Sequence, residues 1–301
     1  PARGSGAFMK LTDYGLILFV MIVWGLNFVV AKWGLAQIPP IFLMGLRFST
    51  VAILLLPFTK VPRDKLPAIA ALSTTLGCVH FSLMFTGLDG VDASAAAIAI
   101  QIQVPFAAIL AAFFFNDRLG WRRLLGMVLA FAGIVIMAGE PRFSSNLLPL
   151  FLIIGASFMW AVANIQIKKM GSVDGFALNA YMSLFAAPQL FLVSAFLEEG
   201  QLASLAAADW WAYASVLFMA VMVTIVSYAV WYRLLRRYTV NQTMPFTLLV
   251  PVFGVLFAVW LLDEPLSLHV LIGGAATIAG VGIIVLRRPR LPDPEAVSKT
   301  T

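Results

Sequence analysis

Two tryptophans in the middle of long apolar runs are the first residues whose types and spacing point to chemistry. Trp24 is followed by Asn27, and Trp160 by Asn164, so in each case an amide falls on nearly the same helix face as the indole. An indole wall with an amide beside it suits an aromatic or apolar solute that has a polar end. We therefore expect both pairs to contact a substrate. The alternative is that the two tryptophans are packing elements.

A second matched pair consists of a polar residue four positions before a proline. Pro105 deprives the carbonyl of Gln101 of its usual donor, and Pro251 does the same to the carbonyl of Thr247. We expect the prolines to act as hinges, and the polar side chains and freed carbonyls to hold polar atoms of a solute. Alternatively, the prolines only kink two helices whose polar groups bond to neighbouring helices.

Three further positions carry charge or titratable groups inside apolar runs. His80 lies deep in one run, and its counterpart is Ser227, which Tyr228 follows. A histidine there can transfer protons or make hydrogen bonds, and we prefer solute contact over a proton relay. Lys32 and Arg47 lie nearer the ends of their runs, where long cationic side chains snorkel. They are expected to shape an outer vestibule or to attract a carboxylate, a structural role being an equal alternative.

The sequence lacks the residues that ion coupling, ATP hydrolysis or intramembrane catalysis would need. Every Asp and Glu falls in a link or at the end of a run, so no midspan carboxylate is predicted to carry protons or sodium. No P-loop occurs. We predict neither a cofactor nor a metal. An intramembrane enzyme would need a catalytic cluster at depth, where only His80 is available, and a channel would usually be a ring of subunits.

Composition places these residues in a membrane. The chain has 61% hydrophobic and only 11% charged residues, and its mean hydropathy is +0.96. This leaves too little polar surface for a soluble globule. The ten apolar runs, each near the length that crosses hydrocarbon, are 11–35, 40–59, 66–87, 92–115, 121–139, 147–170, 175–197, 210–234, 240–262 and 266–286.

A pattern near the end of each half of the chain indicates how the runs are organised. The stretch that starts at Val104 returns in a looser copy from Val250, with Asp117 corresponding to Glu264. An odd number of runs separates the copies, so they must face opposite sides of the membrane, as in an alternating-access carrier. The predicted units are 9–139 and 140–286 as inverted five-helix repeats, residues 1–8 as vector-derived sequence and 287–301 as a disordered tail.

Loop charges predict the orientation independently of the repeat. With the N-terminus in the cytoplasm, nearly all lysines and arginines fall on the cytoplasmic side, and the opposite links are acidic. The net charge of +6 therefore needs no nucleic-acid partner. Trp231 is expected in the aromatic belt at the inner boundary. Both termini are predicted to be cytoplasmic.

These residues together resemble a known family. The first run contains W24-G25-L26-N27-F28-V29-V30-A31-K32, which is followed by Pro40 and Arg47-Phe48. This resembles the start of the drug/metabolite transporter superfamily, specifically its EamA-type exporters. A proline-containing run, a short acidic turn and a glycine-rich run resemble the end of that family's repeat. Asp117 stands where the family usually has Glu, and Ser183 or a neighbour where Arg47 would recur.

The resemblance implies ten helices, a central cavity between two five-helix halves, and export of small metabolites, amino acids or drugs. Within the family, the chain most resembles exporters of aromatic amino acids. We therefore expect a monomeric carrier in the bacterial inner membrane that exports aromatic and other neutral amino acids. The alternative substrates are planar cations such as methyl viologen.

Overall fold

The protein contains ten helices that are long and apolar enough to cross a membrane. The computed structural model describes residues 10–115, 120–140, 146–238 and 240–286, and no strand occurs in these ranges. The spans, numbered 1 to 10 in chain order, are Leu11–Leu35, Pro40–Phe58, Arg63–Asp89, Ala93–Phe114, Trp121–Ala138, Leu148–Met170, Gly175–Leu197, Trp210–Leu235, Met244–Leu262 and Leu268–Val285. The predicted all-α, ten-helix membrane fold is confirmed. The predicted end segments 1–8 and 287–301, and Asp117, lie outside the described residues.

Five spans are single continuous α-helices. They are α1 (Leu11–Leu35), α7 (Trp121–Ala138), α9 (Leu148–Met170), α10 (Gly175–Leu197) and α16 (Leu268–Val285). One of them, α10, contains Pro188 in its interior. Span 2 consists of α2 (Pro40–Leu55) and a short 3-10 turn (Leu56–Phe58). A further helix, α11 (Gln201–Ala207), lies in the link between spans 7 and 8. Helix α11 is too short to appear as an apolar run and was not predicted from the sequence.

Spans 3 and 8 each contain a π-helical segment in their middle. Span 3 runs through α3 (Leu66–Leu72), the π-helix η3 (Ser73–His80) and α4 (Phe81–Asp89). Span 8 runs through α12 (Trp210–Phe218), the π-helix η5 (Met219–Val226) and α13 (Ser227–Arg237). Such segments are rare and occur frequently at functional sites. The two spans occupy the third position of their respective halves.

Spans 4 and 9 each contain a 3-10 segment that ends three residues before a proline. Span 4 consists of α5 (Ala93–Ala99), η4 (Ile100–Ile102) and α6 (Gln103–Phe115). In the second half, α14 (Val240–Thr243) and η6 (Met244–Leu248) precede α15 (Leu249–Leu262). Pro105 and Pro251 follow these segments, and a proline removes the donor that would keep the preceding turn α-helical. The backbone therefore departs from α-geometry at Gln101 and at Thr247.

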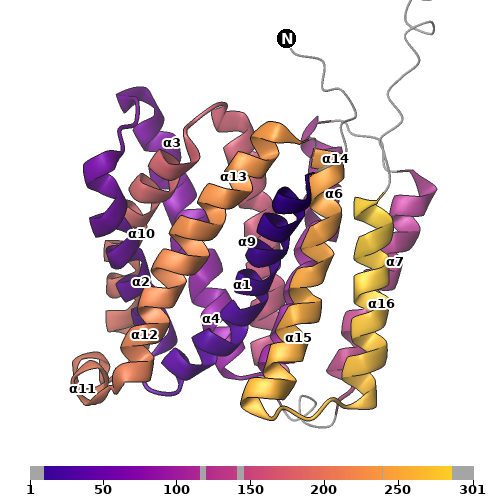
Figure 1. Cartoon of the computed structure of the whole chain (residues 1–301). Helices are drawn as coiled ribbons and strands as arrows, with labels where there is room; N and C mark the ends of the chain where they lie inside the picture. Colours follow the sequence, from indigo (N-terminus) through magenta and orange to yellow (C-terminus); the bar gives the residue numbers. More distant parts are fainter. Residues whose placement is uncertain (1–9, 116–119, 141–145, 239, 287–301) are drawn as a thin grey trace, which may run out of the picture.

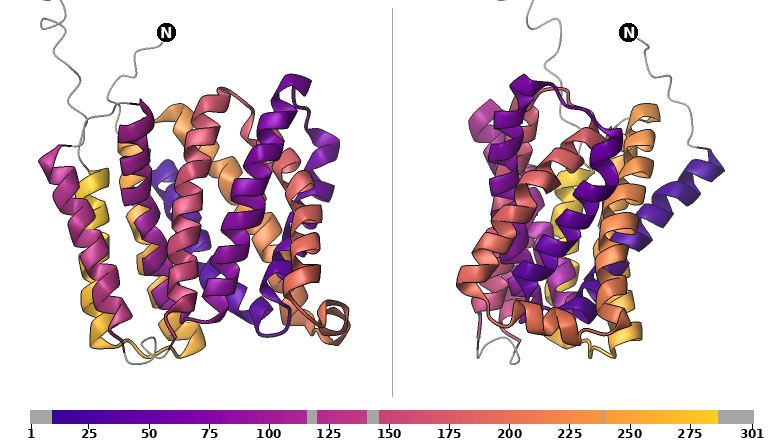
Figure 2. Two further views of the ribbon diagram at one scale, coloured as in Figure 1. Left: turned by 180° about the vertical axis from the view of Figure 1, so that it is seen from behind. Right: turned by 90° about the vertical axis from the view of Figure 1, so that its left-hand side faces the viewer.

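The spans stand side by side in one bundle with two faces. Helix α1 begins and α16 ends at the same face, which we call the terminal face (Figure 1). Helix α11 lies at the opposite, distal face. The packed pairs α7–α16 and α2–α10 stand at opposite edges of the bundle, as the views from front and back both show (Figures 1 and 2). The remaining spans, with the irregular segments, lie between these pairs.

Glycines allow α7 and α16 to touch through their backbones. A Cβ atom on Gly126 would lie 2.7 Å from the carbonyl oxygen of Gly280, and one on Gly280 would collide with the carbonyl oxygen of Gly126. Gly133 and Gly273 oppose each other in the same reciprocal way. Small residues at such contacts are what drives close helix packing in a bilayer. The close approach of α7 and α16 at this edge of the bundle therefore depends on the missing side chains of these glycines.

Replacing Gly133 by alanine is expected to destabilise the protein by about 1–3 kcal/mol, the usual cost of overpacking. The added Cβ would collide with Thr277 and with the backbone of Gly273, which cannot yield without separating the helices. The thermal unfolding midpoint in detergent is the measurement. Gly15→Ala is the matched control, because a Cβ at Gly15 in α1 meets no atom within 4 Å. An equal midpoint for both variants would contradict the packing argument.

Candidate functional site

Aromatic side chains from spans 1 and 8 meet in the interior of the bundle. The ring of Trp24 lies 5.5 Å from that of Tyr228 and 5.5 Å from that of Trp231, and the rings of Tyr228 and Tyr232 lie 5.7 Å apart. We call these four residues the aromatic cluster. Trp24 and Tyr228 are both predicted site residues, and the structure brings them together from opposite halves of the chain. Trp231 is only 6% exposed, so its predicted place in an interfacial belt is wrong.

Arg47 lies inside the bundle and not at the outer vestibule predicted from the sequence. Its side chain is 4% exposed, and its Nη2 donates to Thr224 Oγ1 at 3.0 Å. The guanidinium carbon lies 5.2 Å from the ring centre of Phe81 and 5.9 Å from that of Phe48. Helix α2 packs against α4 and η5, and this face carries Arg47 inward. Aromatic faces and a hydroxyl take the place of the water that a snorkelling arginine would reach.

His80 is buried next to this arginine. Its Nδ1 lies 2.7 Å from the carbonyl oxygen of Ala156 in α9, and a carbonyl can only accept, so Nδ1 carries a proton. The imidazole is also packed edge-on against Phe81 at 4.8 Å. Both His80 and Tyr228 lie close enough to Arg47 to interact with its charge. The buried polar group of Arg47, His80, Thr224 and Tyr228 thus adjoins the aromatic cluster through Tyr228.

Hydroxyl groups of span 8 are bonded within the π-helical turn. Thr224 Oγ1 donates to the carbonyl of Met219 at 3.0 Å, and Ser227 Oγ donates to that of Met222 at 2.7 Å. Both carbonyls lie five residues earlier, which is the spacing of a π-helix. The proton of Ser227, the counterpart of His80, is therefore occupied within its own span. Thr224 keeps its oxygen as an acceptor for Arg47.

The predicted pair Gln101 and Thr247 have different surroundings. Thr247 Oγ1 donates to the carbonyl of Met244 at 2.7 Å within its own 3-10 segment. Gln101 is 7% exposed, and its side chain makes no hydrogen bond with the described residues. The amide can therefore bond to a solute or to water, which the occupied hydroxyl proton of Thr247 cannot. Of the two, Gln101 is the better candidate for solute contact.

The two tryptophan–asparagine pairs also differ. Asn27 Oδ1 is buried and has no hydrogen-bond partner, whereas Asn164 Nδ2 folds back to the carbonyl of Trp160 at 2.9 Å. Among the described residues, no ring contact joins Trp160 to the aromatic cluster. The structure thus places Trp24 at the contact between the halves and leaves Asn27 on the same helix with a buried, unpartnered oxygen. It does not bring Trp160 to this contact.

Carboxylates of the second half cap helices of the first half at the distal face. Glu264 accepts from the backbone N–H of Ala93 at 2.6 Å and from that of Ser94 at 3.0 Å. Glu198 accepts in the same way from Ile41 at 2.7 Å and from Phe42 at 2.9 Å. Neither α5 nor α2 has a side-chain cap of its own, so these carboxylates satisfy N–H groups that would otherwise lack acceptors.

A reciprocal amide–carboxylate contact lies at the same face. Gln37 Nε2 donates to Asp209 Oδ1 at 2.7 Å, and the backbone N–H of Asp209 donates to Gln37 Oε1 at 2.8 Å. The Gln37 amide, together with backbone N–H groups of α12, lowers the pKa of Asp209. We call Gln37, Glu198, Asp209 and Glu264 the distal clasp. Lys32 also lies at this face, where its Nζ donates to the carbonyl of Asp89 at the end of α4 at 3.0 Å.

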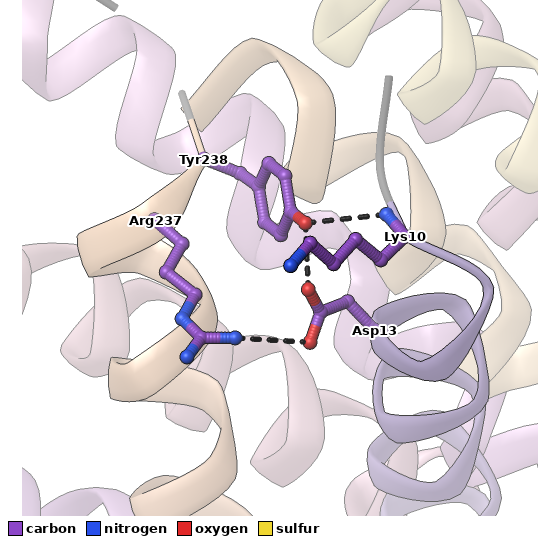
Figure 3. A network of polar contacts seen from close by, with 4 residues as sticks. All are labelled: Lys10, Asp13, Arg237 and Tyr238. Carbon is purple, nitrogen blue, oxygen red and sulfur yellow. Dashed lines mark hydrogen bonds and ion pairs between the residues drawn. The ribbon is translucent and has the colours of Figure 1, made fainter. Parts of the chain in front are cut away.

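At the terminal face, a buried carboxylate joins spans 1 and 8. Asp13, 2% exposed, accepts from the Tyr238 hydroxyl at 2.6 Å and pairs with Arg237 at 3.5 Å (Figure 3). The Tyr238 oxygen accepts in turn from the backbone N–H of Lys10 at 3.3 Å. The hydrogen bond to Asp13 raises the pKa of Tyr238. Contacts between the halves therefore exist at both faces.

Tyr238→Phe is expected to lower the thermal unfolding midpoint, because it removes the 2.6 Å hydrogen bond that the Tyr238 hydroxyl donates to the buried carboxylate of Asp13. Since the folded-state pKa of Tyr238 is raised, this stabilisation is complete below the ordinary tyrosine pKa of about 10. It is lost as the pH rises through the raised value. Unfolding midpoints measured against pH provide the test, with Tyr14→Phe as control. A difference that persisted above the raised pKa would contradict the assignment.

Comparisons with known proteins identify relatives along nearly the whole chain. The pattern of the EamA-like transporter family matches residues 12–139 and, a second time, residues 147–286. A "Probable amino-acid metabolite efflux pump" of Escherichia coli (strain K12) is 34% identical over 288 residues, which cover 92% of this chain and 96% of that protein. A protein of the same name from Salmonella typhimurium (strain LT2) is 35% identical over 289 residues, with 92% and 96% covered.

A solved crystal structure has a similar fold. It superposes with a TM-score of 0.59 at 15% sequence identity, covering 92% of this chain and 98% of that one. At this identity the likeness concerns the fold alone. Among the described residues, no group of three histidine, cysteine or acidic side chains could hold a metal ion. The polar and aromatic residues between the halves are thus the candidate site.

Proposed function

Because this chain belongs to the EamA-like transporter family, we propose that it exports aromatic and other neutral amino acids and their metabolites. Family membership makes it a multi-pass transporter of the inner membrane rather than an enzyme. Two relatives at 34% and 35% identity carry the name of amino-acid metabolite efflux pumps, which supports the substrate class. The preference for aromatic amino acids is supported by the rings of Trp24 and Tyr228, whose centres lie 5.5 Å apart beside a buried polar group.

The proposed mechanism is alternating access about a central site. The family pattern matches each half once, and each half holds five spans, so equivalent ends of the halves fall on opposite faces. The π-helical and 3-10 interruptions recur in equivalent spans. Segments that depart from regular helix are natural places for a bend, and Pro105 and Pro251 follow two of them. We assign residues 9–139 and 140–286 to the two moving halves.

Outward access would open the distal clasp, and inward access would loosen the Asp13 contact. The distal clasp joins the halves at the distal face, and the Asp13 contact joins them at the terminal face. Only one of these two sets of contacts therefore needs to break at a time. We place the terminal face in the cytoplasm, because lysines and arginines gather there and the distal links are acidic. The described residues at the distal face include Asp89, Glu199 and Asp263.

Planar cations fit this site less well than neutral or zwitterionic solutes. Arg47 is buried at the centre of the polar group, and no carboxylate of the described residues lies within salt-bridge distance of its guanidinium. A positively charged solute such as methyl viologen would meet this charge without compensation. The site therefore favours amino acids over cationic drugs.

Efflux from cells tests the proposal. Bacteria that express the protein and are loaded with phenylalanine, tryptophan or leucine as dipeptides should release the free amino acid faster than cells with an empty vector. Methyl viologen resistance should be unchanged. Equal release of all three amino acids with and without the protein would refute the substrate class, and increased viologen resistance would favour the drug exporter.

A further inference from the structure

We propose that Arg47 is the anchor for the carboxylate of the transported solute. This inference rests on the proposed export function and adds to it a required chemical group, an anionic carboxylate. It is carried by the burial of the guanidinium, by its unused donors and by the groups that surround it.

The first observation is a buried charge without an opposite charge. Arg47 is 4% exposed, and the described residues place no carboxylate within 4.0 Å of it. A buried cation is costly unless it is paired, and in a bilayer interior such residues generally face a partner or a solute pathway. The faces of Phe48 and Phe81 compensate only part of this cost. The counter-ion of the Arg47 guanidinium is therefore an anion that binds and dissociates during transport.

The second observation is the state of the hydrogen-bond donors. An arginine has five N–H groups in a planar fork that matches a carboxylate. Here Thr224 accepts from Nη2, and Nε is buried without any acceptor. A purely structural arginine at this depth should use more of its donors, because an unsatisfied buried donor destabilises the fold. The unused donors are what a carboxylate would engage.

The third observation is that aromatic and amide side chains lie near Arg47. Tyr228 lies within electrostatic range of Arg47, and its ring lies 5.5 Å from that of Trp24, so it belongs both to the polar group and to the aromatic cluster. A solute with its carboxylate at Arg47 could thus lay an aromatic side chain against Trp24. Asn27, whose Oδ1 is buried without a partner on the same helix as Trp24, could accept from the ammonium group of an amino acid.

The experiment compares phenyl compounds that carry the carboxylate with others that lack it. Binding to purified wild-type protein is measured by thermal stabilisation with phenylalanine, phenylalaninamide, 3-phenylpropionate and phenethylamine. The two carboxylates should stabilise the protein, and the amide and the amine should require at least about tenfold higher concentrations for an equal effect. Equal stabilisation by phenylalanine and its amide would overturn the inference.

Variants locate the preference at Arg47. In Arg47→Gln the preference for phenylalanine over its amide should disappear, whereas in Arg47→Lys part of it should remain, because a point charge replaces the fork. Lys32→Gln is the control, since Lys32 caps α4 at the distal face and should leave the preference intact. An unchanged preference in Arg47→Gln would refute this anchor alone. If the wild type binds none of the four compounds and exports no amino acid, the proposed function fails as well.

Discussion

Trp24→Ala should lower the rate of phenylalanine export at least about tenfold, a loss of about 1.4 kcal/mol, while folded protein remains in the membrane. The indole contacts Tyr228 and Trp231 of the other half at 5.5 Å, so the variant removes one wall of the proposed site. Each aromatic pair contributes about 0.5–1.5 kcal/mol beyond its area burial, and a solute ring would lose a similar contact. Initial efflux rates, normalised to folded protein, are the measurement.

Two variants make the Trp24 result specific. Trp24→Phe keeps an aromatic face and should recover much of the rate. Trp260→Ala removes an indole that is 73% exposed, and it should export at the wild-type rate. If Trp24→Ala also transports normally, the site does not lie at this contact between the halves.

Cross-linking the distal clasp should stop transport almost completely. In a Cys78→Ala background, cysteines at positions 37 and 209 replace side chains that now lie in hydrogen-bond contact. A disulfide or a short bis-thiosulfonate bridge would hold the halves together at this face, and alternating access requires that they separate there. The measurement is counterflow in proteoliposomes before bridging, after bridging and after reduction.

Reduction should restore the rate, which distinguishes a locked carrier from a damaged one. The two single-cysteine variants, treated in the same way, should be unaffected. Undiminished transport by the bridged protein would show that the distal clasp stays closed during turnover.

The fold could be predicted from the sequence because each span is a long apolar run bounded by polar links. The spans Leu11–Leu35 and Gly175–Leu197 coincide with their predicted runs at both ends. Hydropathy does not encode the register of neighbouring helices, however. It therefore could not show that Arg47 points inward, since an arginine seven residues into a span has enough reach to snorkel.

The candidate site was predicted only in part. Trp24 could be selected because an amide follows it on the same helix face, and Tyr228 because it follows Ser227, the counterpart of His80. Thr224 was not predicted, because threonine is common in membrane helices. No sequence pattern predicted the π-helix in which Thr224 accepts a hydrogen bond from Arg47. Ser227 and Thr247 were chosen by correspondence with His80 and Gln101, but local backbone carbonyls take their hydroxyl protons. Corresponding positions can share a place in the fold without sharing hydrogen-bond partners.

The most direct test of an amino-acid exporter is solute counterflow by the purified protein. Proteoliposomes are loaded with unlabelled phenylalanine and diluted into labelled phenylalanine at low concentration, with and without a pH gradient. We predict a transient accumulation of label that protein-free liposomes do not show and that Trp24→Ala reduces strongly. A dependence on the gradient would reveal proton coupling. If no accumulation occurs with phenylalanine, tryptophan or leucine under either condition, the proposal that this chain carries amino acids is wrong.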